Sequence, residues 1–163
     1  CNNARRHWYN CVSVGETIVS HIRTRIRQNL AATLTGLPNT GSNCFDTRVF
    51  AVHQAIMPAI CVYTLNESTQ YPSMGPPRTL HKTMTCRIEV YVQMTGTYDE
   101  MVDQICADIE EALYTDLTRG GLAVDTKLTT FQADFSAEGE QPVMVGRLNC
   151  DVMYFSVEGS PEG

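Results

Sequence analysis

The sequence predicts an α+β fold, with a mainly antiparallel sheet of about five strands packed by two helices. Residues 84–94 alternate apolar and polar side chains without a break, which indicates a strand with one dry face and one polar face. Residues 16–34 carry isoleucine or leucine at nearly every fourth position, and residues 98–113 carry a second apolar stripe. Both patterns are typical of amphipathic helices. The predicted order is helix, hairpin, long strand, helix, strand, strand.

One domain is expected over residues 15–157, between an N-terminal arm (1–14) and a short flexible tail (158–163). With 163 residues and 43% hydrophobic content, the chain is long enough to bury a single core. It has no run of 18 apolar residues, so we expect no membrane-spanning helix. The first fifteen residues lack the apolar stretch of a secretory signal peptide.

The first helix is expected over Glu16–Leu34. Ser13 is a suitable N-terminal cap, because Glu16 three residues later completes the Ser-x-x-Glu capping pattern. Gly36 favours the conformation that follows a helix, and Pro38 cannot continue one, so the helix is predicted to end before them.

A hairpin of two strands is expected next, over Arg48–His53 and Ala59–Leu65. A loop follows over Asn66–Leu80, where three prolines, a glycine and many small polar residues oppose regular structure. Loops of this length inside compact domains are usually functional or disordered. Tyr71 and Met74 supply the apolar anchors that a docking loop needs; a solvated connector without a role is the alternative.

The second helix is expected to run from Thr97 to about Leu117. Residues 97–100 form a capping box, and Gly120 with Gly121 stops the helix. The remaining prediction comprises a strand over Leu122–Gln132, a polar loop over Ala133–Gln141 and a last strand over Val143–Val157. That last strand is expected to face the core with Leu148, Cys150, Val152 and Tyr154.

The net charge of −6 is unevenly distributed: residues 1–30 carry +4 and the remaining residues carry −10. A basic segment of this kind can be a nucleic-acid arm, although the overall acidity argues against general phosphate binding. It can also be the solvated face of a helix. A third interpretation is charge complementarity between neighbouring copies of the chain, which orients partners.

Seven cysteines are spread along the chain, and none forms a Cys-x-x-Cys pair or a Cys/His cluster at zinc spacing. Most lie in apolar runs, where a free cysteine behaves as a small hydrophobe. Reduced structural thiols, and hence a cytoplasmic origin, are the favoured interpretation. A lipoprotein acylated at Cys1 is the alternative.

We find no pattern typical of a catalytic centre, a metal site or a cofactor site, and we therefore expect a protein that is not an enzyme. Gly36 and Gly41 are followed by neither the lysine nor the helix of a phosphate-binding loop. Asp99 and Asp103 share a helical face, but no histidine joins them. Arg119 begins a single Arg-Gly-Gly tripeptide, which is a weak sign of RNA binding. A small cysteine-dependent or nucleotide-handling enzyme is the alternative of this class.

The order and spacing of several runs resemble the tail terminator proteins of long-tailed, siphovirus-like bacteriophages. The resemblance covers roughly residues 14–157. The runs are Glu16–Leu34; Arg48-Val-Phe and Met57-Pro-Ala-Ile-Cys-Val-Tyr; Arg87-Ile-Glu-Val-Tyr-Val; Tyr98-Asp-Glu, Ile109-Glu and Ala112-Leu; Gly121-Leu-Ala-Val-Asp; and Val152-Met-Tyr.

This resemblance implies a ring-forming subunit, in a hexamer that caps the head-proximal end of the tail tube. The ring would end tube polymerisation and join the tail to the neck. Its implied partners are further copies of the chain, the major tail tube protein and a neck connector protein, and DNA would pass through it without specific binding. The implied location is the tail–neck junction of a virion assembled in the host cytoplasm, with no membrane contact. A head-side neck connector or tail-completion protein is the alternative.

Six residues are the predicted partner-binding residues. The first choice is the loop Glu67–Leu80, especially Tyr71, Met74 and Arg78. The second choice is the exposed face of the long strand, with Arg87, Glu89 and Tyr91.

Overall fold

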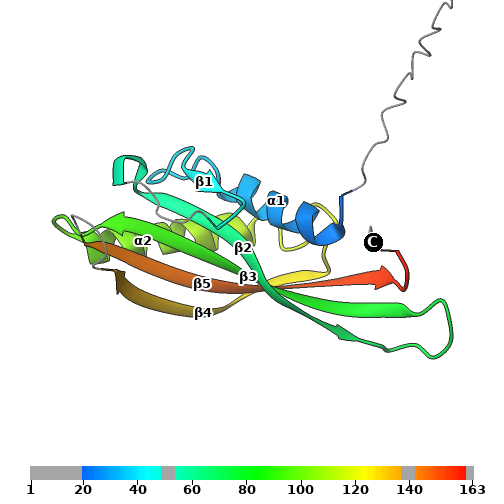
Figure 1. The fold of residues 1–163 in the computed structure, drawn as a ribbon. Coiled ribbons are helices and arrows are strands. Elements are labelled where there is room, and N and C mark those ends of the chain that lie inside the picture. Colours follow the sequence, from blue (N-terminus) through cyan, green and yellow to red (C-terminus); the bar gives the residue numbers. More distant parts are fainter. Residues whose placement is uncertain (1–19, 49–53, 137–141, 161–163) are drawn as a thin grey trace, which may run out of the picture.

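The computed structural model describes residues 20–48, 54–136 and 142–160 (Figure 1). The predicted N-terminal arm, the Ser13 cap, most of the expected strand Arg48–His53 and the chain end at 161–163 lie outside the described residues. None of the described helices is long and apolar enough to span a lipid bilayer.

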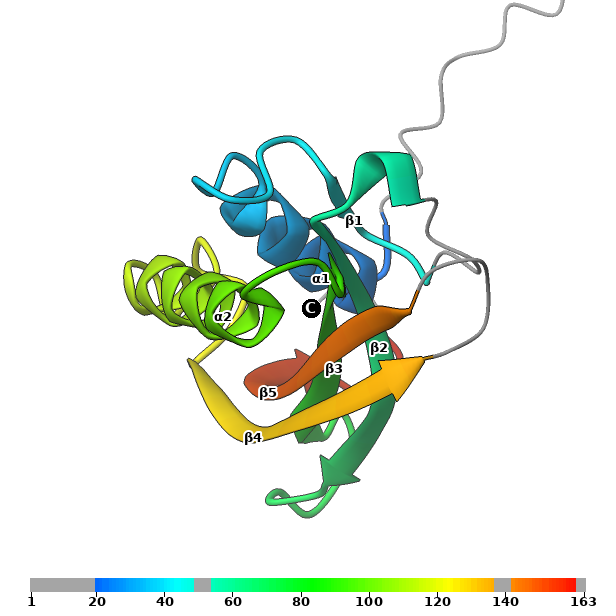
Figure 2. The ribbon, with the colours of Figure 1, turned by 90° about the vertical axis from the view of Figure 1, so that its left-hand side faces the viewer.

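The described residues form two α-helices, a short 3-10 helix and five strands, which confirms the predicted α+β class. The elements are α1 (Ile22–Leu34), β1 (Cys44–Phe45), η1 (Gln54–Ile56), β2 (Ala59–Gln70), β3 (Thr79–Gln93), α2 (Tyr98–Tyr114), β4 (Asp125–Ser136) and β5 (Val143–Val157). The sheet order is β1-β2-β3-β5-β4. All neighbours are antiparallel except β1 and β2. Figure 2 shows both helices on one side of the twisted sheet.

The hydrophobic core lies between the helices and the sheet. It is built from alternate residues of β3 and β5, as their sequence patterns predict. The buried side chains are Met84, Cys86, Ile88, Val90 and Val92 of β3; Leu148, Cys150, Val152 and Tyr154 of β5; Ile22, Ile26 and Leu30 of α1; and Val102, Ile105 and Ile109 of α2. Burying an aliphatic side chain of this size contributes about 1.5–3 kcal/mol, so this layer supplies most of the stabilisation.

Gly146 lets α2 pack closely on the centre of the sheet. A Cβ atom at this position would lie 2.9 Å from Cγ1 of Val102 on α2 and 3.4 Å from the ring of Phe131 on β4. Contacts of 2.9 Å are too short for carbon atoms in a packed interior. The absence of a side chain on β5 therefore sets the distance between α2 and the sheet.

The first helix begins at Ile22 instead of near Glu16. Ser20 and His21 lie outside the helix, and His21 is its N-terminal cap. Nδ1 of His21 accepts a hydrogen bond of 3.1 Å from the backbone N–H of Arg23. This bond satisfies one of the unpaired donors of the first turn, which fixes the start of the helix.

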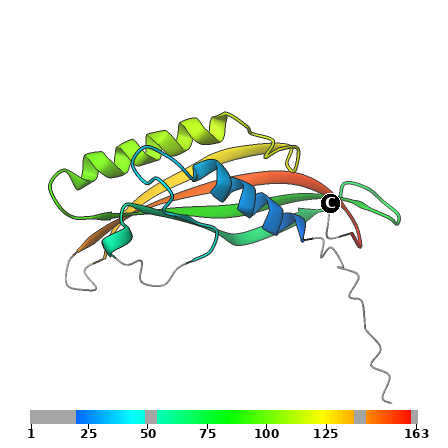
Figure 3. The ribbon, with the colours of Figure 1, turned by 90° about the horizontal axis from the view of Figure 1, so that it is seen from above.

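The predicted loop Asn66–Leu80 is confirmed in its centre and wrong at both ends. Strand β2 continues to Gln70 and β3 begins at Thr79, so only residues 71–78 connect the strands. The backbone ladder with β3 persists beyond a bulge between Thr64 and Asn66. Toward its tip the hairpin projects past the helices (Figures 1 and 3), and residues 66–70 of β2 carry polar side chains on both faces there.

The expected hairpin of two strands before residue 66 is not observed among the described residues. The strand beside β2 is β1, which has two residues and runs parallel to β2. Asn43 holds this segment in place: its carbonyl accepts from the N–H of Ile60 at 2.8 Å, and its Nδ2 donates to the carbonyl of Ile56 at 2.8 Å. Arg48 lies outside any strand.

The ends of α2 and β4 also differ from prediction. Thr97 occupies the N-terminal cap position of α2, but its side chain makes no capping hydrogen bond. The helix ends at Tyr114, where the buried Arg119 donates from Nη2 to the carbonyl of Leu113 at 2.5 Å. A cation at a helix C-terminus is favourable, and this contact replaces a further helical turn. Strand β4 runs over Asp125–Ser136, so the first residues of the predicted polar loop Ala133–Gln141 are strand.

Candidate interaction surfaces

The tip of the β2–β3 hairpin brings together three of the predicted contact residues. Tyr71 is 61% exposed and Met74 is fully exposed. The guanidinium carbon of Arg78 lies 5.9 Å from the centroid of the Tyr71 ring. Nη1 of Arg78 also lies 3.2 Å from Oε1 of Glu158, which follows β5. The tip thus presents apolar side chains beside a cation, as a docking surface needs.

The tip is ordered by local bonds. The backbone N–H of Thr79 donates to Oγ of Ser73 at 2.9 Å, and Gly75 adopts a positive φ of 92° that favours glycine. A backbone held in this way loses less conformational freedom when a partner binds.

The second predicted surface is partly wrong. Glu89 does point away from the helices, but it is only 1% exposed. Its carboxylate accepts from the hydroxyl of Tyr91 at 2.7 Å and from Nε of Arg147 at 3.0 Å. Ile56 and Met57 pack against the same buried Ala59 and Cys61 as Tyr91 does, so part of this sheet face is covered by the segment that precedes β2. Glu89 is therefore not exposed as predicted, and a role in partner contact stays a prediction.

The pKa of Glu89 reflects this setting. Burial by itself raises the pKa of a carboxyl group, but hydrogen bonds from Tyr91, Tyr63 and Arg147, and the charge of Arg147, together lower it. Burial and the contact with Glu89 raise the pKa of Tyr91. Arg87, the remaining residue of this prediction, donates from Nε to Oδ1 of Asn149 at 3.0 Å and stays partly exposed.

A third surface was missed by the sequence analysis: an apolar groove between α2 and β4. One hollow of about 200 Å³ is lined by Glu110, Leu113, Tyr114, Leu117, Thr126 and Leu128. A second hollow of about 260 Å³ is lined by Asp103, Cys106, Ala107, Glu110, Phe131 and Leu148. Glu110 borders both, and we call the two hollows together the α2–β4 groove. Tyr114 is 78% exposed and Phe131 is 51% exposed, so the groove leaves large apolar side chains in solvent.

A bulge explains why the sequence did not reveal this groove. The pairing of β4 with β5 shifts between Leu128 and Thr130. The shift places Leu128 and Phe131 on the same side of the sheet although they are three residues apart. The apolar spacing of β4 therefore fits neither a regular strand nor a helix.

The one thiol among the groove's lining residues is Cys106, whose pKa is raised mainly by burial and further by the acidic rim. Burial, and then the charges of Asp103 and Glu110, raise the pKa of Cys106 to about 12. The groove is thus an apolar surface bordered by negative charge.

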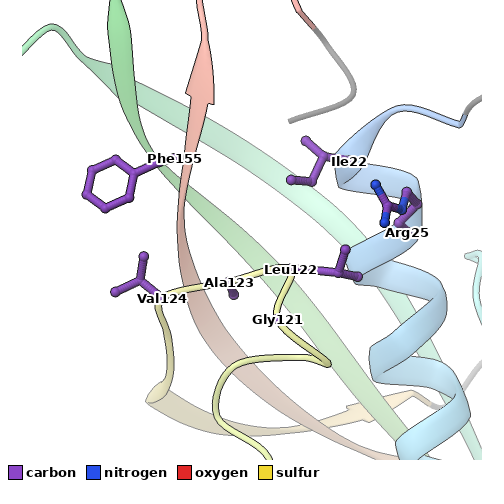
Figure 4. Close-up of a pocket in the computed structure, with 7 residues that line it drawn as sticks. All are labelled: Ile22, Arg25, Gly121, Leu122, Ala123, Val124 and Phe155. Atoms are coloured by element: carbon purple, nitrogen blue, oxygen red, sulfur yellow. The ribbon is translucent and has the colours of Figure 1, made fainter.

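A further pocket of about 330 Å³ lies at the N-terminal end of α1 (Figure 4). Its lining residues come from α1, from the segment 121–124 and from β5, and its one ionic group is Arg25. The walls include Ile22, Leu122 and Phe155.

The described residues hold no group of three or more metal-ligating side chains. Two of the four histidines are described: His21 caps α1, and His81 stacks on Phe155 with ring centroids 5.1 Å apart. Arg119 is fully buried, so it cannot serve as the RNA contact that its tripeptide weakly indicated.

Five cysteines are described, and all are free thiols. Cys86 and Cys150 face each other in the core. Cys44 is partly buried, which raises its pKa to about 11. These positions fit the predicted structural role.

No protein-family model matches the sequence. A search of curated proteins also found no match. Among solved structures, the chain is similar to one chain of a structure described as the virion of a native gene transfer agent (GTA) particle. That chain is 11% identical with a TM-score of 0.33, and the match covers 88% of this chain and 99% of the other. A similarity at this level does not assign a function.

Proposed function

We propose that this chain is a structural virion protein, six copies of which form a ring at the head-proximal end of a phage tail tube. The ring ends polymerisation of the tube and joins it to the neck. The resemblance of the sequence to tail terminator proteins suggests this role. The observation that carries it is that one subunit exposes two unlike apolar surfaces, the hairpin tip and the α2–β4 groove.

Two unlike surfaces favour a heterologous interface, in which one surface of a subunit binds the other surface of the next. Such an interface closes into a ring when its rotation divides a full turn, and a closed ring cannot grow sideways. A ring that binds the tube on one side and the neck on the other stops further addition of tube subunits.

The composition is compatible with a ring through which DNA passes without specific binding. The net charge of −6 gives little general attraction for phosphates. We also propose that the protein catalyses no reaction, since the polar clusters described above, such as Glu89 with Arg147, are links between strands.

The proposed partners are further copies of the chain, the major tail tube protein and a neck connector protein. Tyr71, Met74 and Arg78 are the first candidates for contact, because the hairpin tip holds them beyond the helical layer (Figure 3). Arg87 and Tyr91 remain secondary candidates on the sheet face that points away from the helices.

Electron microscopy of particles made without the protein tests this function. Loss of a terminator yields tails of irregular and excessive length. Finished tails beside separate heads would instead identify a head-side connector, and normal virions would remove both functions.

A hairpin variant extends the test to the proposed contact. The double replacement Tyr71→Ser with Met74→Ser keeps the length and strand register of the hairpin and removes the exposed apolar side chains of its tip. We expect a folded protein that fails to restore tail length. The replacement Lys127→Ala, at an exposed residue of β4, is the control that should restore it.

A further inference from the structure

We infer that the hairpin tip of one copy inserts into the α2–β4 groove of the next copy. This inference rests on the proposed ring, and it specifies the interface that closes it. The occupant is thus a second copy of this chain, and the inserted group is Met74 with Tyr71 beside it.

The tip has the properties of an inserted group. Met74 is fully exposed at the end of a hairpin that projects past the helices (Figures 1 and 3). A flexible thioether adapts to irregular apolar hollows, and an aromatic ring provides a large rigid contact. Tyr71 and Arg78 are held together by a cation–π contact at 5.9 Å, so apolar and cationic groups enter as one unit.

The groove has the complementary properties. Leu113, Leu117 and Leu128 provide apolar walls to one hollow, and Phe131 and Leu148 to the other. Glu110 borders both hollows and Asp103 borders one, so a cation that accompanies the apolar tip meets carboxylates there. Arg78 on the tip is such a cation, and its side chain is 43% exposed. Charge pairs of this kind fix the register of an interface.

The larger pocket near α1 is a poorer receptor for the tip. Its one ionic lining residue is a cation, Arg25, so its described lining residues offer Arg78 no carboxylate. This pocket, at about 330 Å³, is larger than either hollow of the groove, but those hollows are bordered by carboxylates. The tip and α2 also occupy different ends of the molecule in Figures 1 and 3, which favours insertion between copies over insertion within one copy.

Photo-cross-linking tests the contact directly. Met74 is replaced by p-benzoylphenylalanine, and the variant is mixed with ¹⁵N-labelled wild-type chain before illumination. We expect interchain cross-links to peptides that contain residues 103–117 or 126–131. The matched control carries the same probe at Lys127, which is exposed on the other face of β4. This variant should give no interchain cross-link to the peptide that contains Met74.

Charge reversal tests the register. Arg78→Glu alone and Glu110→Arg alone should each weaken self-association at least tenfold in sedimentation experiments, and the double variant should recover most of the loss. Glu158→Gln controls for the pair that Arg78 makes within its own chain and should leave association unchanged. Circular dichroism of each variant confirms that it is folded.

Three results would overturn the inference: cross-links from position 74 to residues 121–124, a double variant that associates no better than the single variants, or no interchain cross-link at the highest attainable protein concentration. These experiments use purified protein without tails. A chain that shows the expected contact but does not control tail length would retain this interface and lose the proposed function. A chain that controls tail length but shows cross-links elsewhere would retain the proposed function and lose this interface.

Discussion

Nε of Arg147 donates a 3.0 Å hydrogen bond to the buried carboxylate of Glu89, and the same guanidinium pairs with Asp134 through Nη1. Glu89 lies on β3, Arg147 on β5 and Asp134 on β4, so one arginine links three adjacent strands. The hydroxyl of Tyr91 donates a further hydrogen bond of 2.7 Å to the Glu89 carboxylate. This network lies on the sheet face opposite the helices, and its Tyr91 also packs against the small apolar cluster of Ala59 and Cys61.

Removing the central carboxylate should destabilise the protein. Breaking a buried ion pair costs about 3–5 kcal/mol; because the Arg147 side chain is 26% exposed, we expect a loss of about 2–3 kcal/mol for Glu89→Ala. Urea denaturation measures it. Glu158→Ala breaks an exposed pair and should change the free energy of unfolding very little. Equal losses in the two variants would contradict a structural role for Glu89.

Stability should depend on pH through the same group. The pKa of Glu89 is lowered in the folded protein, so its contribution to stability is present above the ordinary pKa of 4.5. It is lost as the pH falls through the folded pKa, because the unfolded chain binds the proton more tightly. Urea denaturation between about pH 6 and about pH 3 should show this loss. Glu89→Gln should show a smaller change over the same range, and identical profiles would exclude Glu89 as the cause.

Gly146→Ala should destabilise by about 1–3 kcal/mol, the usual cost of overpacking a core. The added Cβ would lie 2.9 Å from Val102, which must move. Combining it with Val102→Ala removes the clash, so the double variant should be less destabilised than the sum of the two single variants. Strict additivity in thermal or urea unfolding would show that Val102 does not limit this position.

Two thiols should resist alkylation in the folded protein. The pKa of Cys44 is raised to about 11 and that of Cys106 to about 12, so both remain protonated at about pH 8, and the thiolate is the reactive form. Peptide mass spectrometry after iodoacetamide treatment should find them labelled only when urea is present. Rapid labelling of Cys106 without urea would mean that the α2–β4 groove opens more than the structure shows.

Local patterns were sufficient to predict some elements. The alternation over Val143–Val157 reproduces the bounds of β5, because a strand between two others needs one buried face along its whole length. The stripe of Val102, Ile105 and Ile109 likewise identified the buried side of α2. Both signals depend only on neighbours in the sequence.

Other features depend on distant residues and were missed. Glu89 is buried because Arg147, 58 positions later, lies opposite it on β5. The polar residues before Gln70 form a strand because β3 pairs with them through backbone atoms, which the side-chain pattern does not report. The α2–β4 groove depends on a bulge that no local pattern indicated. Of the predicted contacts, the structure gathers Tyr71, Met74 and Arg78, and their role remains a prediction.

The two edge strands of the sheet, β1 and β4, affect how the protein behaves during storage. Strand β1 has only two residues, and β4 carries a bulge together with Lys127. An edge strand that is short, charged or bulged is a poor template for strands of other chains, because they need a long flat row of unpaired N–H and C=O groups. Concentrated preparations should therefore be slow to develop amyloid-like fibres, and thioflavin fluorescence during prolonged incubation would monitor this.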